Sequence, residues 1–252
     1  MMRRGIGHIV FLTASLLFAC SRPEPVTGVP VEVTPVPLQL MASYSIGAFA
    51  AEPSGIAYDA LSDAFFVVSD SHPYVYMMDR KGNLIHSILT TSTDLEGVAV
   101  SGTGDTIMIA EERNRIVSFY NRAGTKLGSV TADVATLPNN GLEGVVAMPN
   151  GEVLVLNEKL PGMLLRFSHG GTELSRHTLS FASDYSDLTY HDGALWIISD
   201  ESKTVSRTDL NGNTTAQWSL PFTKGEGIAI VRDTIYIVND ADATLSLFAL
   251  PK

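Results

Sequence analysis

Acidic side chains recur in this chain at the same places of a repeated sequence unit. The unit has an acid before a glycine and an apolar run, then a short turn and a second apolar run that ends in another acid. The stretch NNGLEGVVAMPNGEVLVLNEK at 139–159 contains all of these parts. Five such units, spaced by about 42 residues, begin at Glu52, Asp94, Asn139, Asp184 and Gly225. Carboxylates placed in register by a repeat are hard oxygen ligands of the kind that Ca²⁺ prefers.

Short strands are the elements that must position these acids. Each unit has room for four strands of five to seven residues joined by tight turns, and no segment has a helical period. A fixed period near 40 residues with four strands per unit indicates a β-propeller. We therefore predict an all-β fold, a five-bladed β-propeller with four-stranded blades. An open solenoid or a β-sandwich is the alternative.

The two ends of the chain together account for the last strand. The fifth unit lacks its fourth strand, and an extra strand within Leu38–Ile46 belongs to no unit. Closing the ring with a strand from the other terminus removes the exposed edges of an open array. The N-terminal strand is therefore expected to complete the fifth blade.

The acids fall on one face of the predicted ring. The first strand of a blade lies nearest the central channel, and the second strand returns to the rim where the first began. First strands start with Glu96, Glu143 and Glu226, and with Ser54 and Ser186 in the other two units. Second strands end with Asp70, Glu112, Glu158, Asp200 and Asp240. Up to eight carboxylates, with the amides of Asn157 and Asn239, are thus predicted to ring one mouth of the channel.

Two interpretations of this ring stay open. Close like charges raise one another's pKa, and a bound Ca²⁺ would compensate them. Alternatively, an acid at each repeat junction accepts backbone N–H bonds from the neighbouring blade, which is a structural role. The acids before glycine occur in three units only and are the better ligand candidates, because glycine lets backbone approach closely. Arg113, Lys159 and Lys224 lie beside ring acids and are expected to neutralise them or to contact an anionic ligand.

Composition narrows the classes of partner and of chemistry. The formal net charge is −10, which argues against nucleic acid or anionic lipid and favours cations and basic ligands. Nothing in the chain matches a GxSxG motif, a phosphate-binding loop or a dinucleotide fingerprint, and the histidines form no metal-binding pair. His72 alone lies near the predicted rim, where it would be the only evident general base.

The N-terminal residues predict an exported, lipid-anchored protein. Met1–Arg4 is basic, Ile6–Ala19 is apolar and too short to span a bilayer, and Cys20 is the only cysteine. The sequence LFAC at 17–20 resembles the lipobox of bacterial lipoproteins, which implies cleavage before Cys20, its acylation and, with Ser21 next, an outer-membrane location facing the periplasm. We predict a signal peptide at 1–19, a proline-rich tether at 20–37 and one propeller domain at 38–252. The alternative is an ordinary signal peptide with a chance cysteine.

The repeats also resemble a known family. The first strands LEG and EGI, with the second-strand ends VSD, AEE, NEK and SDE, are similar to those of the SdiA-regulated (YjiK/CarP) family of bacterial envelope β-propellers. The resemblance covers roughly Met41–Leu250. It implies a periplasm-facing propeller, linked in some members to calcium response, with no established catalytic activity. It extends residue by residue to Glu96, Glu112, Glu143, Glu158, Asp200 and Glu226. Asp187 departs from the pattern, because it stands where the other units have glycine.

These observations lead to two functional hypotheses. The first is a calcium-binding or interaction module of the cell envelope, whose partner is an envelope protein or a small cationic ligand at the channel mouth. The second is a Ca²⁺-dependent hydrolase of lactonase or phosphoesterase type, because gluconolactonase-like lactonases are weakly similar. In that case Glu96 or Glu143, with Asn157, Asn239 and Asp240, would hold the metal as a Lewis acid. The first hypothesis is preferred, because no base and no anion clamp stands out.

Overall fold

The structure is a computed structural model that describes residues 35–134 and 140–252. The predicted signal peptide, Cys20 and the tether up to residue 34 lie outside the described residues. Residues 35–252 form one compact unit. None of the described residues belongs to a helix long and apolar enough to cross a bilayer.

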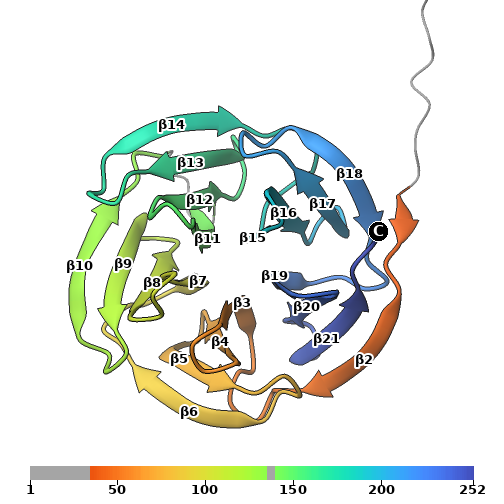
Figure 1. The fold of residues 1–252 in the computed structure, drawn as a ribbon, viewed down its shortest axis with the longest axis horizontal. Coiled ribbons are helices and arrows are strands. Elements are labelled where there is room, and N and C mark those ends of the chain that lie inside the picture. The colour runs from red at the N-terminus through yellow and green to blue at the C-terminus, as the bar shows by residue number, and fades with distance from the viewer. Residues whose placement is uncertain (1–34, 135–139) are drawn as a thin grey trace, which may run out of the picture. The chain divides into compact units, whose positions relative to one another are not determined.

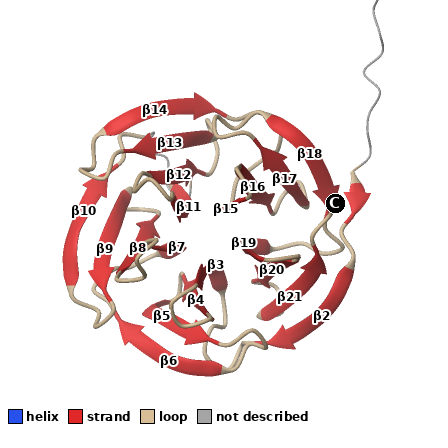
Figure 2. Cartoon of the chain, in the orientation of Figure 1, coloured by secondary structure: helices blue, strands red, loops and turns tan. Residues whose placement is uncertain are grey.

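Five blades of four antiparallel strands surround a central axis, with the first strand of each blade innermost (Figures 1 and 2), and one short parallel strand is added to the edge of blade 4. Blade 1 contains β3 (Pro53–Asp59), β4 (Ala64–Ser69), β5 (His72–Met78) and β6 (Leu84–Leu89). Blade 2 contains β7 (Leu95–Val100), β8 (Thr106–Glu111), β9 (Ile116–Asn121) and β10 (Lys126–Thr131). Blade 3 contains β11 (Leu142–Ala147), β12 (Val153–Asn157), β13 (Met163–Phe167) and β14 (Glu173–Thr178). Blade 4 contains β15 (Asp187–His191), β16 (Ala194–Ser199), β17 (Thr204–Thr208) and β18 (Thr214–Ser219). Blade 5 contains β19 (Gly225–Val231), β20 (Thr234–Asn239), β21 (Thr244–Ala249) and β2 (Leu40–Ser45). The predicted five-bladed propeller is confirmed.

The N-terminal strand closes the ring as predicted. β2 pairs antiparallel with β21, from Leu40 opposite Phe248 to Ser45 opposite Thr244. Before it, β1 (Val36–Pro37) pairs in parallel with the outer edge of β18 in blade 4. Leu38, between these two strands, is buried in the cluster that joins blades 4 and 5. The segment therefore spans the junction between the two blades as well as completing the fifth.

The core lies between the blades. Every pair of neighbouring blades shares one buried apolar cluster, five clusters in all within the described residues. The second strands are buried on both faces, which explains why AFFVVS in β4 and ALWIIS in β16 are almost continuous apolar runs. The outer strands are mostly exposed or partly buried, and β14 alternates between the two along its whole length. Burial is thus greatest in the second strands and least in the outer strands.

Inner strands meet backbone to backbone at the axis. We call the five residues nearest this contact the axial residues; they are Gly55, Gly97, Gly144, Asp187 and Gly227. A Cβ on Gly97 would lie 2.3 Å from the carbonyl oxygen of Glu143, and a Cβ on Gly55 would lie 2.5 Å from that of Glu96. No side chain fits at such a distance, so glycine is required where one inner strand contacts the next.

We expect Gly97→Ala to destabilise the protein, because its Cβ has no space beside β11. Overpacking of this kind against backbone costs about 2 kcal/mol, which lowers the melting temperature by about 4–8 °C in a domain of this size. Gly128→Ala in β10 is the matched control, since nothing lies within 4 Å of the Cβ it would add. Thermal unfolding of both variants tests the requirement, and equal melting temperatures would contradict it.

Candidate functional site

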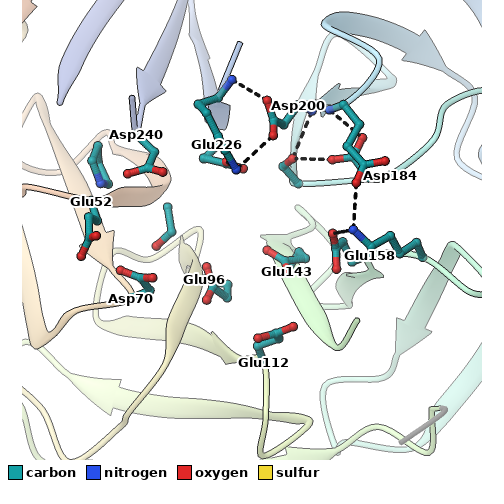
Figure 3. A pocket seen from close by; sticks show the side chains of 16 residues that line it. Glu52, Asp70, Glu96, Glu112, Glu143, Glu158, Asp184, Asp200, Glu226 and Asp240 are labelled. Carbon is teal, nitrogen blue, oxygen red and sulfur yellow. Dashed lines mark hydrogen bonds and ion pairs between the residues drawn. The ribbon is translucent and has the colours of Figure 1, made fainter. Parts of the chain in front are cut away.

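A cavity of about 310 Å³ opens at the mouth where the first strands begin and the second strands end (Figure 3). We call it the acidic cavity. Eleven carboxylates line it: Glu52, Asp70, Glu96, Glu112, Glu143, Glu158, Asp184, Asp200, Glu201, Glu226 and Asp240. Lys159 and Lys224 are the lysines in its lining. Repetition of the blade thus concentrates negative charge in one place.

All eight predicted ring acids lie in this cavity, but the two predicted amides do not. Asn157 precedes Glu158 at the end of β12, and successive side chains of a strand point to opposite sides. The Asn157 Nδ2 donates to the carbonyl oxygens of Lys159 at 3.2 Å and Pro161 at 2.8 Å. The Asn239 Nδ2 likewise donates to the Thr223 carbonyl at 2.6 Å. Both amides therefore hold turns and do not line the cavity.

Four further acids belong to the site and were not assigned from the sequence: Glu52, Asp94, Asp184 and Glu201. Three of them open a repeat unit, so the start of each unit was the signal that could have identified them. The Asp94 Oδ2 accepts the backbone N–H of Arg113 at 2.9 Å. The Asp184 Oδ1 accepts the backbone N–H of Glu201 at 3.1 Å. These bonds fix the turn after the second strand. They match the structural interpretation, in which a repeated acid accepts backbone N–H bonds.

Two groups of three carboxylates come close enough to share a cation. They are Asp94, Glu96 and Glu112, and then Glu112, Glu143 and Glu158. Within each group the oxygen atoms lie within 4.8 Å of one another. Oxygens that bind one Ca²⁺ at about 2.4 Å are separated by up to about 4.8 Å. Glu112 belongs to both groups and connects blade 2 with blade 3.

Burial and mutual repulsion hold several of these acids in their protonated form. Burial raises the pKa of Glu96 to about 9, and the charges of Asp70 and Glu112 add to the effect. Burial also raises the pKa of Glu143 well above its ordinary value, and the charge of Glu96 is the next largest cause. The pKa of Glu226 rises to about 7 through burial, although Lys224 opposes the shift. Without a counterion, the cavity therefore binds protons at neutral pH.

The two lysines neutralise one side of the cavity, as expected from the sequence. The Lys159 Nζ lies 2.7 Å from Glu158 and 3.0 Å from Glu201. The Lys224 Nζ lies 3.2 Å from Asp200 and 3.4 Å from Glu226. Within 35–134 and 140–252, neither Glu96 nor Glu143 forms a hydrogen bond or ion pair with another side chain. Glu96 and Glu143 are thus carboxylates of the cavity that lack a compensating charge, whereas Asp94 and Glu158 beside them pair with Arg113 and Lys159.

The hydrolase arrangement receives less support from this geometry. His72 is absent from the cavity lining, and its Nδ1 lies 3.0 Å from the hydroxyl of Ser71 beside it. Both lysines are paired with carboxylates, so they do not form the free cationic cluster that a phosphoester would need.

We expect the metal-free protein to lose stability as the pH rises from about 5 to about 9. The native state keeps protons on Glu96, Glu143 and Glu226 that the unfolded chain has already released above about pH 4.5. Stability therefore falls until the pH exceeds the native pKa values. Denaturant unfolding in chelator across this range measures the slope.

The variant Glu96→Gln should flatten this dependence and stabilise the metal-free protein at pH 8 by roughly 1 kcal/mol. Glu173→Gln on β14 is the matched control, because that acid pairs with Arg176 outside the cavity. A stability that is constant or rises with pH would contradict the assigned burial of these acids.

Comparison with known proteins places the chain by family and by fold. The family model described as SdiA-regulated matches residues 39–243. Comparison with curated proteins gives no match.

Among solved structures, Myxococcus xanthus glutaminyl cyclase has a TM-score of 0.65 at 12% identity, covering 85% of this chain and 97% of that one. A chain of the nidogen/laminin complex has a TM-score of 0.59 at 16% identity, covering 80% and 77%. Virginiamycin B lyase from Staphylococcus aureus has a TM-score of 0.53 at 12% identity, covering 80% and 67%. At such low identity these structures share the fold alone, whereas the family match spans nearly the whole propeller: the chain belongs to the SdiA-regulated family.

Proposed function

We propose that the protein is a cell-envelope propeller that binds Ca²⁺ in the acidic cavity and acts as a calcium-response or interaction module without catalysis. The observation that carries the proposal is the pair of carboxylate groups that share Glu112. Asp94 and Glu96 would hold a cation from blade 2, and Glu143 and Glu158 from blade 3.

The donor set fits a hard divalent cation. Every candidate ligand atom is a carboxylate oxygen, and the flexible oxygen geometry of Ca²⁺ tolerates the irregular spacing of such a cluster. Glu96 and Glu143 are buried beside one another without a compensating cation among the described side chains. A divalent ion would remove the repulsion that raises their pKa. The same charge would attract a small cationic ligand or a basic group of an envelope protein, which are the partners that we propose for the cavity mouth.

Calcium should raise the melting temperature of the unit 35–252, which contains the complete ring. At a free concentration of about 100 Kd, binding to the native state alone adds about 2.7 kcal/mol, or about 5–10 °C. Glu112→Gln should abolish most of this rise, because both carboxylate groups lose a member. Glu173→Gln removes the same charge outside the cavity and should leave the rise unchanged.

Scanning calorimetry in Ca²⁺ and in chelator makes this comparison. An identical melting temperature in both would remove calcium binding from the proposed function. An equal response to Mg²⁺ would change the identity of the cation but keep the site.

The proposed location rests on the N-terminal sequence. We infer that Cys20 carries the lipid and that the residues from there to position 34 hold the propeller away from the outer membrane, since β1 already belongs to the propeller. Labelled palmitate should enter the full-length chain expressed in a bacterial envelope and should not enter Cys20→Ser. Equal labelling of the two would contradict the anchor.

A metal-dependent hydrolase is the second candidate, favoured by one observation. Glu96, with a pKa of about 9, and Glu226, with a pKa of about 7, keep protons near neutral pH inside a cavity, as general acids do. Metal-dependent turnover of a lactone or phosphoester panel that disappears in Glu143→Gln would favour this candidate over the binding module.

A further inference from the structure

Two cavities that share no lining residue are separated by the axial residues. The acidic cavity is lined by the residues just before each axial residue, such as Glu143 and Ser186. A second cavity of about 270 Å³ is lined by apolar residues just after them, such as Val145 and Leu188. The axial residues themselves line neither cavity. They form the boundary between a charged space and an apolar one.

Four of the axial residues touch the next inner strand directly, and Asp187 does so through its side chain. The Cβ of a residue at Gly227 would lie 2.8 Å from the backbone nitrogen of Ile56, so β19 and β3 are in close contact. Between β15 and β19 the corresponding position is Asp187, which already has a Cβ. Its carboxylate spans this junction, because Oδ2 accepts the backbone N–H of Ile228 at 2.9 Å.

The carboxylate of Asp187 is a convergence point for backbone donors. It is fully buried, and its Oδ1 accepts the N–H of Leu188 at 2.8 Å. The N–H of Ile56 also bonds to it. These three donors belong to the inner strands of blades 4, 5 and 1. A buried N–H without an acceptor is unfavourable by about 1–3 kcal/mol, so one side chain stabilises three strands at once.

Asp187 also contacts the strand that carries Glu143. A Cβ at Gly144 would lie 2.6 Å from the Cα of Asp187 and 2.7 Å from its Oδ1. Asp187 therefore adjoins the residue after Glu143, and through Ile228 it adjoins the strand of Glu226. Displacement of its carboxylate would move both acids.

We propose that Asp187 is the residue that closes the central axis. It fills the one junction where glycine contact is missing, separates the two cavities, and acts as a positioning residue for Glu143 and Glu226. The role requires side-chain oxygens that accept from the three amides; burial raises the pKa of the Asp187 carboxyl, and the three backbone donors oppose this shift.

Amide hydrogen exchange of the unit 35–252 tests the closure in Asp187→Gly and Asp187→Asn. In Asp187→Gly the amides of Ile56, Leu188 and Ile228 lose their acceptor, and we expect about tenfold faster exchange in β3, β15 and β19 but not in β7. Asp187→Asn keeps one acceptor oxygen and should give a smaller increase at the same strands. If the glycine variant fails to fold, the asparagine variant alone carries the comparison.

Asp59→Asn is the matched control, because Asp59 is about as buried but bonds to Arg122 at the C-terminal end of β3. It should lower stability without the exchange pattern of the Asp187 variants. Unchanged exchange at the three amides, or an increase spread evenly over all inner strands, would overturn the proposal.

Titration with Ca²⁺ adds a second readout that rests on the proposed function. Asp187→Asn should weaken binding by about tenfold while Asp59→Asn leaves it unchanged. Equal affinity in the wild type and Asp187→Asn would overturn the positioning role. A wild type that does not bind Ca²⁺ would overturn the proposed function instead, and the exchange experiment would still decide the closure.

Discussion

Contact between the backbones of neighbouring inner strands determines where every acid of the cavity lies. The glycines at the axis allow β3, β7 and β11 to touch without intervening side chains. Glu96, Glu143 and Glu226 each precede an axial glycine, so the tight contact at the axis forces these three side chains into one small space. The fold thus brings like charges close together, and the position of these charges follows from how the inner strands pack.

Repulsion between these acids lowers part of the folding stability that packing between the blades provides. Five apolar clusters between the blades supply the stabilising burial, and the acidic cavity adds repulsion at their inner edge. Proteins keep such unfavourable clusters where a ligand relieves them, and stability is commonly reduced at functional sites for this reason. Lys159 relieves Glu158 of blade 3 and Glu201 of blade 4, and Lys224 relieves Asp200 and Glu226. Glu96 and Glu143 have no such partner among the described side chains.

Repetition explains what could be predicted from the sequence. The spacing of the units predicted the blades, and the matched positions of Glu96 and Glu112 predicted the face that they share. Asn157 and Asn239 do not line the cavity, because each directly precedes a ring acid and successive side chains of a strand point to opposite sides. The contact between Asp187 and β19 could not be predicted, because it joins residues 41 positions apart through one side chain. The extra strand β1 was not foreseen either, since two residues carry no periodic signal.

Pairing of β2 with β21 has a consequence for the order in which the chain folds. The partners Ser43 and Ser246 are 203 residues apart, so the last sheet is completed only after the whole chain has emerged. Contacts of such long range slow folding, and an unpaired strand edge favours association with other chains. Leu40–Ser45 is synthesised early and must wait for its partner, which lies at the other end of the propeller sequence. The interval before ring closure is therefore the stage at which this protein is most exposed to aggregation and most dependent on chaperones.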